Sequence, residues 1–272
     1  TANVTPKAVT VSGITVANKV YDSTTAANVS TATALFNGLV AGDQVRVNAT
    51  GVFSDKNVGT AKGVALSSTY TGADLANYSI GDQAVALASI TPATIVRVTG
   101  ITASDKTYDG NATATLLTGA ASFEGLFAGD VLSVAGASGQ FDSRHAGTGK
   151  TVNISAISLG GADQGNYLLQ DTTATALASV GKATLVVQAT GQDKIFDGTR
   201  LADVTLTDNR IAGDQVNVNY GSANFDNVRG GLNKLVTVTG LVIAGGADGG
   251  NYQLATTTVT TTATVIADDT AV

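Results

Sequence analysis

The sequence contains no cysteine, methionine or tryptophan, and it has only two prolines, one histidine and a single glutamate, Glu124. Without cysteine no disulfide can support the fold. With no cysteine, no second histidine and no serine in a nucleophile-elbow context, neither a zinc site nor a Ser-His-Asp triad can be assembled. The lack of thiols and thioethers removes the side chains that oxidise most readily, which suits a location outside the cell. We therefore expect a protein that is not an enzyme.

Basic charge is also sparse. The formal net charge is -6, and the 15 lysines and arginines are scattered singly along the chain. No basic stripe is available for a phosphate backbone, so we expect no binding to nucleic acid. No apolar run is long enough to cross a bilayer, and no charged-then-apolar signal segment follows Thr1, so we expect no membrane insertion and a monomeric fragment of a longer polypeptide.

The residues that are abundant favour strands and turns. Alanine, threonine, valine, glycine, serine, asparagine and aspartate dominate, and helix-favouring charged residues are few. A five-residue motif recurs at a spacing of about 88 residues, which indicates a tandem array. The motif reads Lys19-Val20-Tyr21-Asp22-Ser23, Lys106-Thr107-Tyr108-Asp109-Gly110 and Lys194-Ile195-Phe196-Asp197-Gly198. We predict an all-β protein of three modules, residues 1–90, 91–180 and 181–272, each with a modest core of its own.

The recurring motif has the character of a strand end followed by a tight turn. An aromatic ring can be buried on one face, and Asp-Gly tolerates the positive φ values of a turn. Phe196 replaces tyrosine in the third copy, so we expect the ring to act by packing and the hydroxyl to be dispensable. Ser23 replaces glycine in the first copy, so we expect no left-handed backbone at that position.

Further motifs recur in the same order within each module. A Gly-Asp turn precedes an alternating segment, then come a phenylalanine and a polar loop, and then a Gly-Ala-Asp turn before Asn-Tyr. The Asn-Tyr pairs are Asn77-Tyr78, Asn166-Tyr167 and Asn251-Tyr252. Six or so short strands in each module predict a sandwich-like or β-grasp-like fold. Because no Gly/Ser-rich spacer separates the modules, we expect an elongated rod.

Aspartates at the recurring turns suggest calcium as a possible cofactor, since Ca²⁺ prefers carboxylate and carbonyl oxygens. The candidates are Asp74, Asp163 and Asp248. The dense Asp-x-Asp-x-Asp-Gly spacing of a calcium loop is missing, however, and aspartate also favours turns for local hydrogen-bonding reasons. The preferred interpretation is turn chemistry, with no cofactor required and no other metal site.

Two other site types deserve comparison with simple packing. The recurring lysines Lys19, Lys106 and Lys194 lie near acids and asparagines, the ingredients of a spontaneous Lys-Asn or Lys-Asp crosslink, although an ion pair is the commoner arrangement. Most aromatic residues fall in three-fold register, which favours a core over a stacking platform for sugars. The single histidine, His145, is expected to lie in a surface loop.

Taken together, these motifs resemble the YDG repeat family, which is close to the MBG repeats of very large bacterial surface and secreted proteins, including filamentous-haemagglutinin-like exoproteins. The resemblance rests on Lys-x-Tyr-Asp-Gly, Gly-Asp-x-Val, Phe with a following Gly-Thr, and Gly-Ala-Asp-x-x-Asn-Tyr, and it covers essentially the whole chain. Ser23 and Phe196 depart from the signature without disturbing its order.

The resemblance implies a structural spacer or stalk within a large adhesin at a bacterial surface or in the secreted state, in adhesion or biofilm formation. The expected partners are the rest of the adhesin chain and a host or matrix glycan or protein. The alternative is a binding module whose loops contact glycan, matrix or a neighbouring cell. The resemblance supplies no catalytic residues.

Overall fold

The structure is a computed structural model that describes residues 2–267. Across these residues the regular elements are short and long β-strands together with three single-turn 3₁₀ helices, η1 (Leu75–Asn77), η2 (Gln164–Asn166) and η3 (Gly249–Asn251). The prediction of an all-β protein with three repeated modules is confirmed. Strand formation follows the composition, because β-branched residues alternate with small polar ones.

The first repeat contains ten strands. They are β1 (Lys7–Ser12), β2 (Thr15–Val16), β3 (Lys19–Val20), β4 (Ala26–Ala27), β5 (Val29–Ser30), β6 (Leu35–Asn37), β7 (Arg46–Phe53), β8 (Gly59–Thr71), β9 (Tyr78–Gly81) and β10 (Val85–Thr91). The alanine-containing stretch from Thr24 to Leu39 forms short strands.

The second repeat has a similar order. Its strands are β11 (Ala93–Ile95), β12 (Val98–Thr99), β13 (Thr102–Ala103), β14 (Lys106–Thr107), β15 (Thr113–Ala114), β16 (Leu116–Leu117), β17 (Ser122–Phe123), β18 (Ser133–Phe141), β19 (Gly147–Gly160), β20 (Tyr167–Leu169) and β21 (Ala174–Gly181).

The third repeat completes the described chain. Its strands are β22 (Ala183–Leu185), β23 (Val187–Gly191), β24 (Lys194–Ile195), β25 (Val204–Asp208), β26 (Asn217–Asn219), β27 (Ser222–Phe225), β28 (Gly231–Thr239), β29 (Val242–Gly245), β30 (Tyr252–Leu254) and β31 (Thr258–Ile266).

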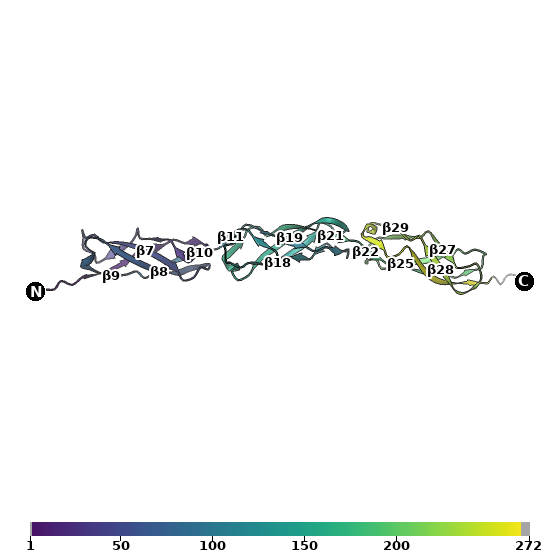
Figure 1. The fold of residues 1–272 in the computed structure, drawn as a ribbon, viewed down its shortest axis with the longest axis horizontal. Coiled ribbons are helices and arrows are strands. Elements are labelled where there is room, and N and C mark those ends of the chain that lie inside the picture. Colours follow the sequence, from purple (N-terminus) through teal and green to yellow (C-terminus); the bar gives the residue numbers. More distant parts are fainter. Residues whose placement is uncertain (1, 268–272) are drawn as a thin grey trace. The chain divides into compact units, whose positions relative to one another are not determined.

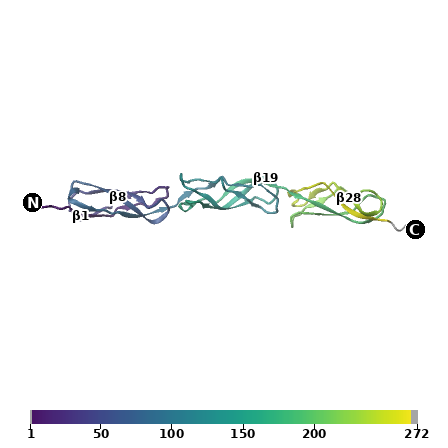
Figure 2. The ribbon, with the colours of Figure 1, turned by 60° about the horizontal axis from the view of Figure 1, so that its bottom comes forward.

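Two sheets face each other in the first repeat. One has the order β6-β1-β9 and the other β3-β10-β8-β7-β4, whose strands β7, β8 and β10 are labelled in Figure 1. Figure 2 labels β1 and β8, one strand from each sheet. Val11 from the first sheet and Val47 from the second lie in one buried cluster with Ile14. This is the sandwich-like arrangement, with alternate side chains turned inward.

The larger sheet recurs in the other repeats. In the second repeat its order is β14-β21-β19-β18-β15, and in the third it is β24-β31-β28-β27. Each corner strand pairs in parallel with the last strand of its own repeat, as β3 does with β10. The corner motif is thereby placed at the same end of each repeat where the chain leaves for the next one.

The connections between repeats are a single residue long. Strand β10 ends at Thr91 and β11 begins at Ala93, with Pro92 between them. Strand β21 ends at Gly181 and β22 begins at Ala183, with Lys182 between them. The absence of a flexible spacer between these strands is confirmed.

The chain divides into two compact units that do not follow the repeat boundaries. The first contains residues up to Gly100 with Thr118–Ala137 and Ala156–Thr173, and the second contains Ile101–Leu117, Ser138–Ser155 and the residues from Ala174 onward. The first unit therefore includes the junction between repeats one and two, and the second unit includes the junction between repeats two and three.

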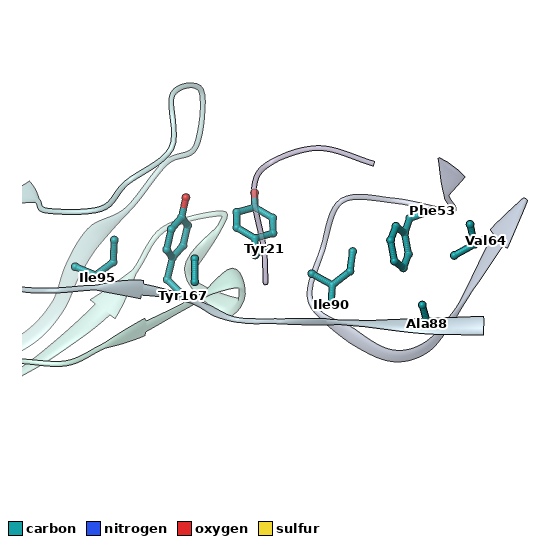
Figure 3. Close-up of a cluster of buried hydrophobic side chains, with 8 residues drawn as sticks. Tyr21, Phe53, Val64, Ala88, Ile90, Ile95 and Tyr167 are labelled. Atoms are coloured by element: carbon teal, nitrogen blue, oxygen red, sulfur yellow. The ribbon is translucent and has the colours of Figure 1, made fainter. Parts of the chain in front are cut away.

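A hydrophobic cluster in the first unit continues across its junction. The cluster joins residues of the first repeat, such as Phe53 and Ile90, with Ile95 and Tyr167 of the second repeat. Figure 3 shows Tyr21 between these two groups. The core of the first repeat is thus not separate from that of the second, which modifies the expectation that each repeat has a core of its own.

Candidate functional site

Each corner motif is held by its lysine. Lys19 Nζ donates to the Asp22 carboxylate at 2.7 Å and to the backbone carbonyls of Thr24 and Ala26 at 2.8 and 3.0 Å. The ammonium also lies 5.5 Å from the centre of the Phe53 ring, whose electron-rich face attracts a cation. The same contacts join Lys106 with Asp109 and Phe141, and Lys194 with Asp197 and Phe225. The lysine therefore connects the corner to the core phenylalanine.

The acid beside each lysine lacks the setting that a spontaneous crosslink requires. The Asp22 side chain keeps 47% of its surface exposed. Partial burial raises the pKa of Asp22, but hydrogen bonds from Lys19 and Thr24 outweigh this effect and lower the pKa below its ordinary value. At Asp197 the hydrogen bond from Lys194 dominates and lowers the pKa to about 2. Because the crosslink needs a buried acid with a raised pKa, the geometry corresponds to an ion pair.

The backbone at Ser23 corrects the sequence-based prediction. Ser23 has a φ of 62°, close to the 82° and 75° of Gly110 and Gly198, so the left-handed conformation is present in all three corners. The Asp22 carboxylate accepts the backbone N–H of Thr24 at 2.9 Å, which holds the turn. The Ser23 hydroxyl also donates to Asp130 at 3.2 Å, a contact that glycine cannot make.

The corner tyrosines also differ from the prediction, which treated their hydroxyls as dispensable. Tyr21 is 1% exposed, and its hydroxyl donates at 2.7 Å to Asp130, the Gly-Asp aspartate of the following repeat. Tyr108 donates in the same way to Asp214 at 2.9 Å. Phe196, at the equivalent position of the third repeat, is 42% exposed. The rings of Tyr21 and Tyr108 are buried as predicted, but the prediction that their hydroxyls are dispensable was wrong, because each hydroxyl makes a contact between consecutive repeats.

The Asn-Tyr tyrosines donate to the same carboxylates from within their own repeat. Tyr167 reaches Asp130 at 2.6 Å, and Tyr252 reaches Asp214 at 2.6 Å. The Tyr21 and Tyr167 rings meet edge to face with centroids 5.4 Å apart, and Figure 3 shows their hydroxyls pointing in the same direction. Each junction therefore places two phenolic donors on one carboxylate oxygen.

A cation from the preceding repeat occupies the other oxygen. Lys56 Nζ lies 2.5 Å from Asp130 Oδ1 and 3.7 Å from an oxygen of Asp163. Arg144 donates to Asp214 at 3.0 Å and to Asp248 at 2.5 Å. Both cations occupy the third position after the core phenylalanine of their repeat. Because the aspartates are buried, this pairing removes the large cost of an uncompensated charge.

Asparagines complete the junctions. Asn166 accepts the backbone N–H of Val58 at 2.9 Å and donates to Asn57 at 3.0 Å. Asn251 accepts the N–H of Ala146 at 2.9 Å, and its amide lies 3.1 Å from Nδ1 of His145. His145 therefore takes the place that Asn57 has in the first repeat. Its side chain is exposed as expected, but it also contacts the next repeat.

The pKa values follow from this arrangement. Burial raises the pKa of Asp130, but hydrogen bonds from Lys56, Tyr167 and Tyr21 outweigh burial and lower the pKa to about 2. Burial and the hydrogen bond to Asp214 together raise the pKa of Tyr108 to about 12. At neutral pH the aspartates are charged and the tyrosines neutral, which is the protonation state that the hydrogen bonds require.

The three calcium candidates act as turn caps. Asp74, Asp163 and Asp248 each accept a backbone N–H from the start of the segment after the Gly-Asp turn, at 2.8, 2.8 and 3.0 Å. Asp163 also forms an ion pair with Lys56, and Asp248 forms one with Arg144. Among residues 2–267, no group of three or more acidic, histidine or cysteine side chains is close enough to hold a metal ion. The oxygens therefore serve the turns, and calcium binding stays a prediction.

The Asn-Tyr and corner residues predicted from the sequence come together at the junctions, but sequence reasoning missed their partners. These partners are Asp130 and Asp214 of the Gly-Asp turns and Lys56 and Arg144 of the polar loop after the core phenylalanine. A signal was present, because Gly-Asp recurs in all three repeats and a cation follows the core phenylalanine at the same offset in two of them.

In the part of the chain that the structure describes, no helix is long and apolar enough to span a bilayer.

Comparison with solved structures finds matches of low sequence identity and low TM-score. One is Drosophila N-cadherin EC1-3, with 6% identity, 85% of this chain and 91% of that chain covered, and a TM-score of 0.22. Another is the I9-I11 tandem from titin, with 10% identity, 96% and 100% covered, and a TM-score of 0.21. No curated protein matches the sequence.

The sequence matches the YDG domain over residues 5–86, 91–175 and 181–262. These matches include the corner motif and the Asn-Tyr pair of every repeat. The chain thus belongs to the YDG domain family, of which it carries three consecutive copies.

Proposed function

We propose that the chain is a structural spacer in a large secreted or cell-surface bacterial adhesin, located outside the cell. The observation that carries this proposal is the repeated junction, in which a one-residue connection is combined with a buried aspartate that binds groups from both repeats. A short connection with a specific buried contact restricts the motion of one repeat against the next. The adhesin context comes from the family resemblance described above.

The same junctions support a role without catalysis. The Asp130 carboxylate, whose pKa is strongly lowered, accepts hydrogen bonds from the Tyr21 and Tyr167 hydroxyls and from the Lys56 ammonium, so protein donors already occupy it. Strongly shifted groups at an active site are normally directed towards a substrate. Here they are directed towards the neighbouring repeat, which is the arrangement of an interface.

Small-angle X-ray scattering of the intact chain tests the spacer proposal. If the three repeats extend end to end, we expect a radius of gyration above about 30 Å, because each repeat adds roughly 35 to 40 Å of length. A compact chain of this length would have a radius of about 19 Å. A value near the compact limit would contradict the proposal, and saturable binding of the chain to a glycan array would favour the alternative of a binding module.

A further inference from the structure

The two junctions use the same pair of complementary surfaces. The first surface, which we call the acceptor face, consists of the Gly-Asp aspartate, the Gly-Ala-Asp aspartate and the Asn-Tyr pair of one repeat. The second surface, which we call the donor end, belongs to the preceding repeat and consists of its corner tyrosine and the cation that follows its core phenylalanine. In the first junction Tyr21 and Lys56 form the donor end, and in the second Tyr108 and Arg144 form it.

The first repeat has an acceptor face built in the same way. Tyr78 donates to Asp43 at 2.5 Å and accepts the N–H of Val40 at 3.2 Å. In the second repeat Tyr167 makes the matching contacts with Asp130 and the N–H of Phe127. Asp74 caps the turn by accepting the N–H of Gln44 at 2.8 Å. The acceptor residues of the first repeat are therefore already in their bound arrangement.

Exposure distinguishes this face from the other two. Asn166 and Asn251 are 5% and 2% exposed, whereas Asn77 is exposed to solvent. Asp130 and Asp214 are buried, whereas Asp43 is only partly buried. A cleft of about 410 Å³ lies here, lined by Asp43, Asn77 and Tyr78 among others. The residues that a preceding repeat covers at the two junctions are thus accessible at the first repeat.

The donor end of the third repeat differs at both hydrogen-bonding positions. Phe196 stands in place of tyrosine, and Val228 stands where Lys56 and Arg144 stand in the other repeats. Both side chains are substantially exposed, at 42% and 41%. If this end docked against an acceptor face, the aspartate there would receive neither a tyrosine hydroxyl nor a cation from it. Burying a carboxylate that lacks these partners is costly.

We propose that the acceptor face of the first repeat binds the donor end of a YDG repeat that precedes it in the same polypeptide and carries a corner tyrosine and a lysine or arginine. Asp43 would accept hydrogen bonds from the tyrosine hydroxyl and from the cation. Lys7 also lines the cleft, at the position of Ala93 and Ala183, but Asp43 and Asp74 together carry two negative charges against its one, so the face still attracts a cation. Pro6 occupies the position of the connecting residue Pro92, directly before the strand that pairs with the Asn-Tyr strand. This continuity favours a preceding repeat over a separate molecule.

A second copy of this chain is the wrong partner, because the end it would offer is that of Phe196 and Val228. The chain can therefore accept a repeat at one end but does not offer the matching donors at the other. Such asymmetry prevents copies from adding head to tail into open filaments, which a self-complementary pair of ends would permit. The inference depends on the junction chemistry alone and stands whether or not the host is an adhesin.

The test uses two chains joined in tandem, with Ile266 of the first copy followed directly by Pro6 of the second. In one fusion the joining repeat keeps its native residues, and in the other it carries Phe196→Tyr and Val228→Arg. The protein has no cysteine, so single cysteines at the exposed Thr260 of the first copy and Thr69 of the second take spin labels without background. Pulsed electron paramagnetic resonance then measures the distance distribution across the new junction.

We expect the Tyr/Arg fusion to show a distribution narrower by a factor of about two than the native fusion, because a docked repeat has one orientation. Asp43→Asn in the second copy of the Tyr/Arg fusion should restore the broad distribution. Equal widths in the two fusions, or no effect of Asp43→Asn, would overturn the inference. Concentration-dependent association of the unfused native chain, abolished by Asp43→Asn, would overturn the exclusion of a second copy as the occupant.

Discussion

At the scale of single residues, the molecule depends on a few carboxylates that accept donors from two repeats. Asp130 is 8% exposed and binds two tyrosine hydroxyls and one ammonium. A buried carboxylate in a low-dielectric setting is stable only while these donors are present. A substitution that removes one of the donors should therefore lower the stability of the fold, because it leaves the buried aspartate with an unsatisfied charge.

Removing one phenolic hydroxyl tests this dependence. We expect Tyr21→Phe and Tyr108→Phe each to lower the free energy of unfolding by about 1–2 kcal/mol, because a buried charged acceptor loses a partner. Phe196→Tyr is the matched control, since its ring is partly exposed, and it should change stability by less than about 0.5 kcal/mol. Urea denaturation followed by circular dichroism measures all three. Equal effects at the three positions would contradict the proposed contact.

The pKa shifts predict how the junctions respond to pH. Hydrogen bonds lower the pKa of Asp130 to about 2, so its contribution to stability is complete above its ordinary pKa near 4 and is lost as the pH falls towards 2. The pKa of Tyr108 is raised to about 12, so its contribution is complete below pH 10 and is lost between about pH 10 and 12.

Thermal unfolding measured between pH 2 and pH 12 follows both the loss of stability at acid pH and the loss at alkaline pH. In Asp130→Asn the acid limb should become shallower, because the titrating carboxylate is gone. A wild-type chain whose stability did not change between pH 4 and pH 2 would show that the carboxylate is not paired as described.

At the scale of elements, the turn before the Asn-Tyr pair depends on a glycine. Gly161, directly after β19, has a φ of 99°, and a Cβ placed there would lie 2.5 Å from the backbone oxygen of Val131. That strand-to-turn approach positions Asp163 for its hydrogen bond to the N–H of Val131. The glycine thus holds the acceptor face in place.

A pair of alanine substitutions in this one turn isolates the effect. We expect Gly161→Ala to destabilise the chain by about 2–4 kcal/mol through left-handed strain and a backbone clash. Gly165→Ala, four positions later, should be close to neutral, because nothing lies within 4 Å of its added Cβ. Differential scanning calorimetry of the two variants makes the comparison, and a tolerated alanine at 161 would contradict the turn geometry.

At the scale of the whole molecule, consecutive repeats share contacts as well as sequence. The cluster that includes Phe53, Ile90 and Ile95 spans the first junction, next to the polar contacts of Asp130. Repeats joined in this way should unfold cooperatively, in contrast to beads on a flexible string. The one-residue connection contributes by holding the two surfaces at a high effective concentration.

Lengthening that connection should separate the repeats energetically. We expect insertion of Gly-Ser-Gly-Ser between Thr91 and Pro92 to divide a single calorimetric transition into two, because the effective concentration of the junction surfaces falls. The same insertion after Gly119, where an added Cβ meets nothing within 4 Å, is the control and should leave the transition intact. An unchanged profile in the first variant would mean that the repeats do not stabilise each other.

Much of the fold followed from local pattern. The alternating segments became strands and the Gly-Asp and Gly-Ala-Asp motifs became turns, because these propensities act over a few residues. Two local predictions failed for different reasons. The left-handed backbone at Ser23 belongs to the turn that Asp22 holds in the first corner, and it occurs in all three corners whatever the side chain. The Tyr21 hydroxyl was judged by comparison with Phe196, whereas its contact depends on Asp130 in the next repeat.

By itself the sequence determined the three-fold repeat, the all-β class and the turn residues, since each is encoded within a window of neighbouring positions. Only the tertiary structure decided which aspartate receives the Tyr21 hydroxyl, because the two residues are 109 positions apart. A hydrogen bond between distant residues forms where folding brings a donor and a buried acceptor together, and no local periodicity records that meeting. The different role of Phe196 became visible only when Tyr21 and Tyr108 were seen in contact with the repeats that follow them.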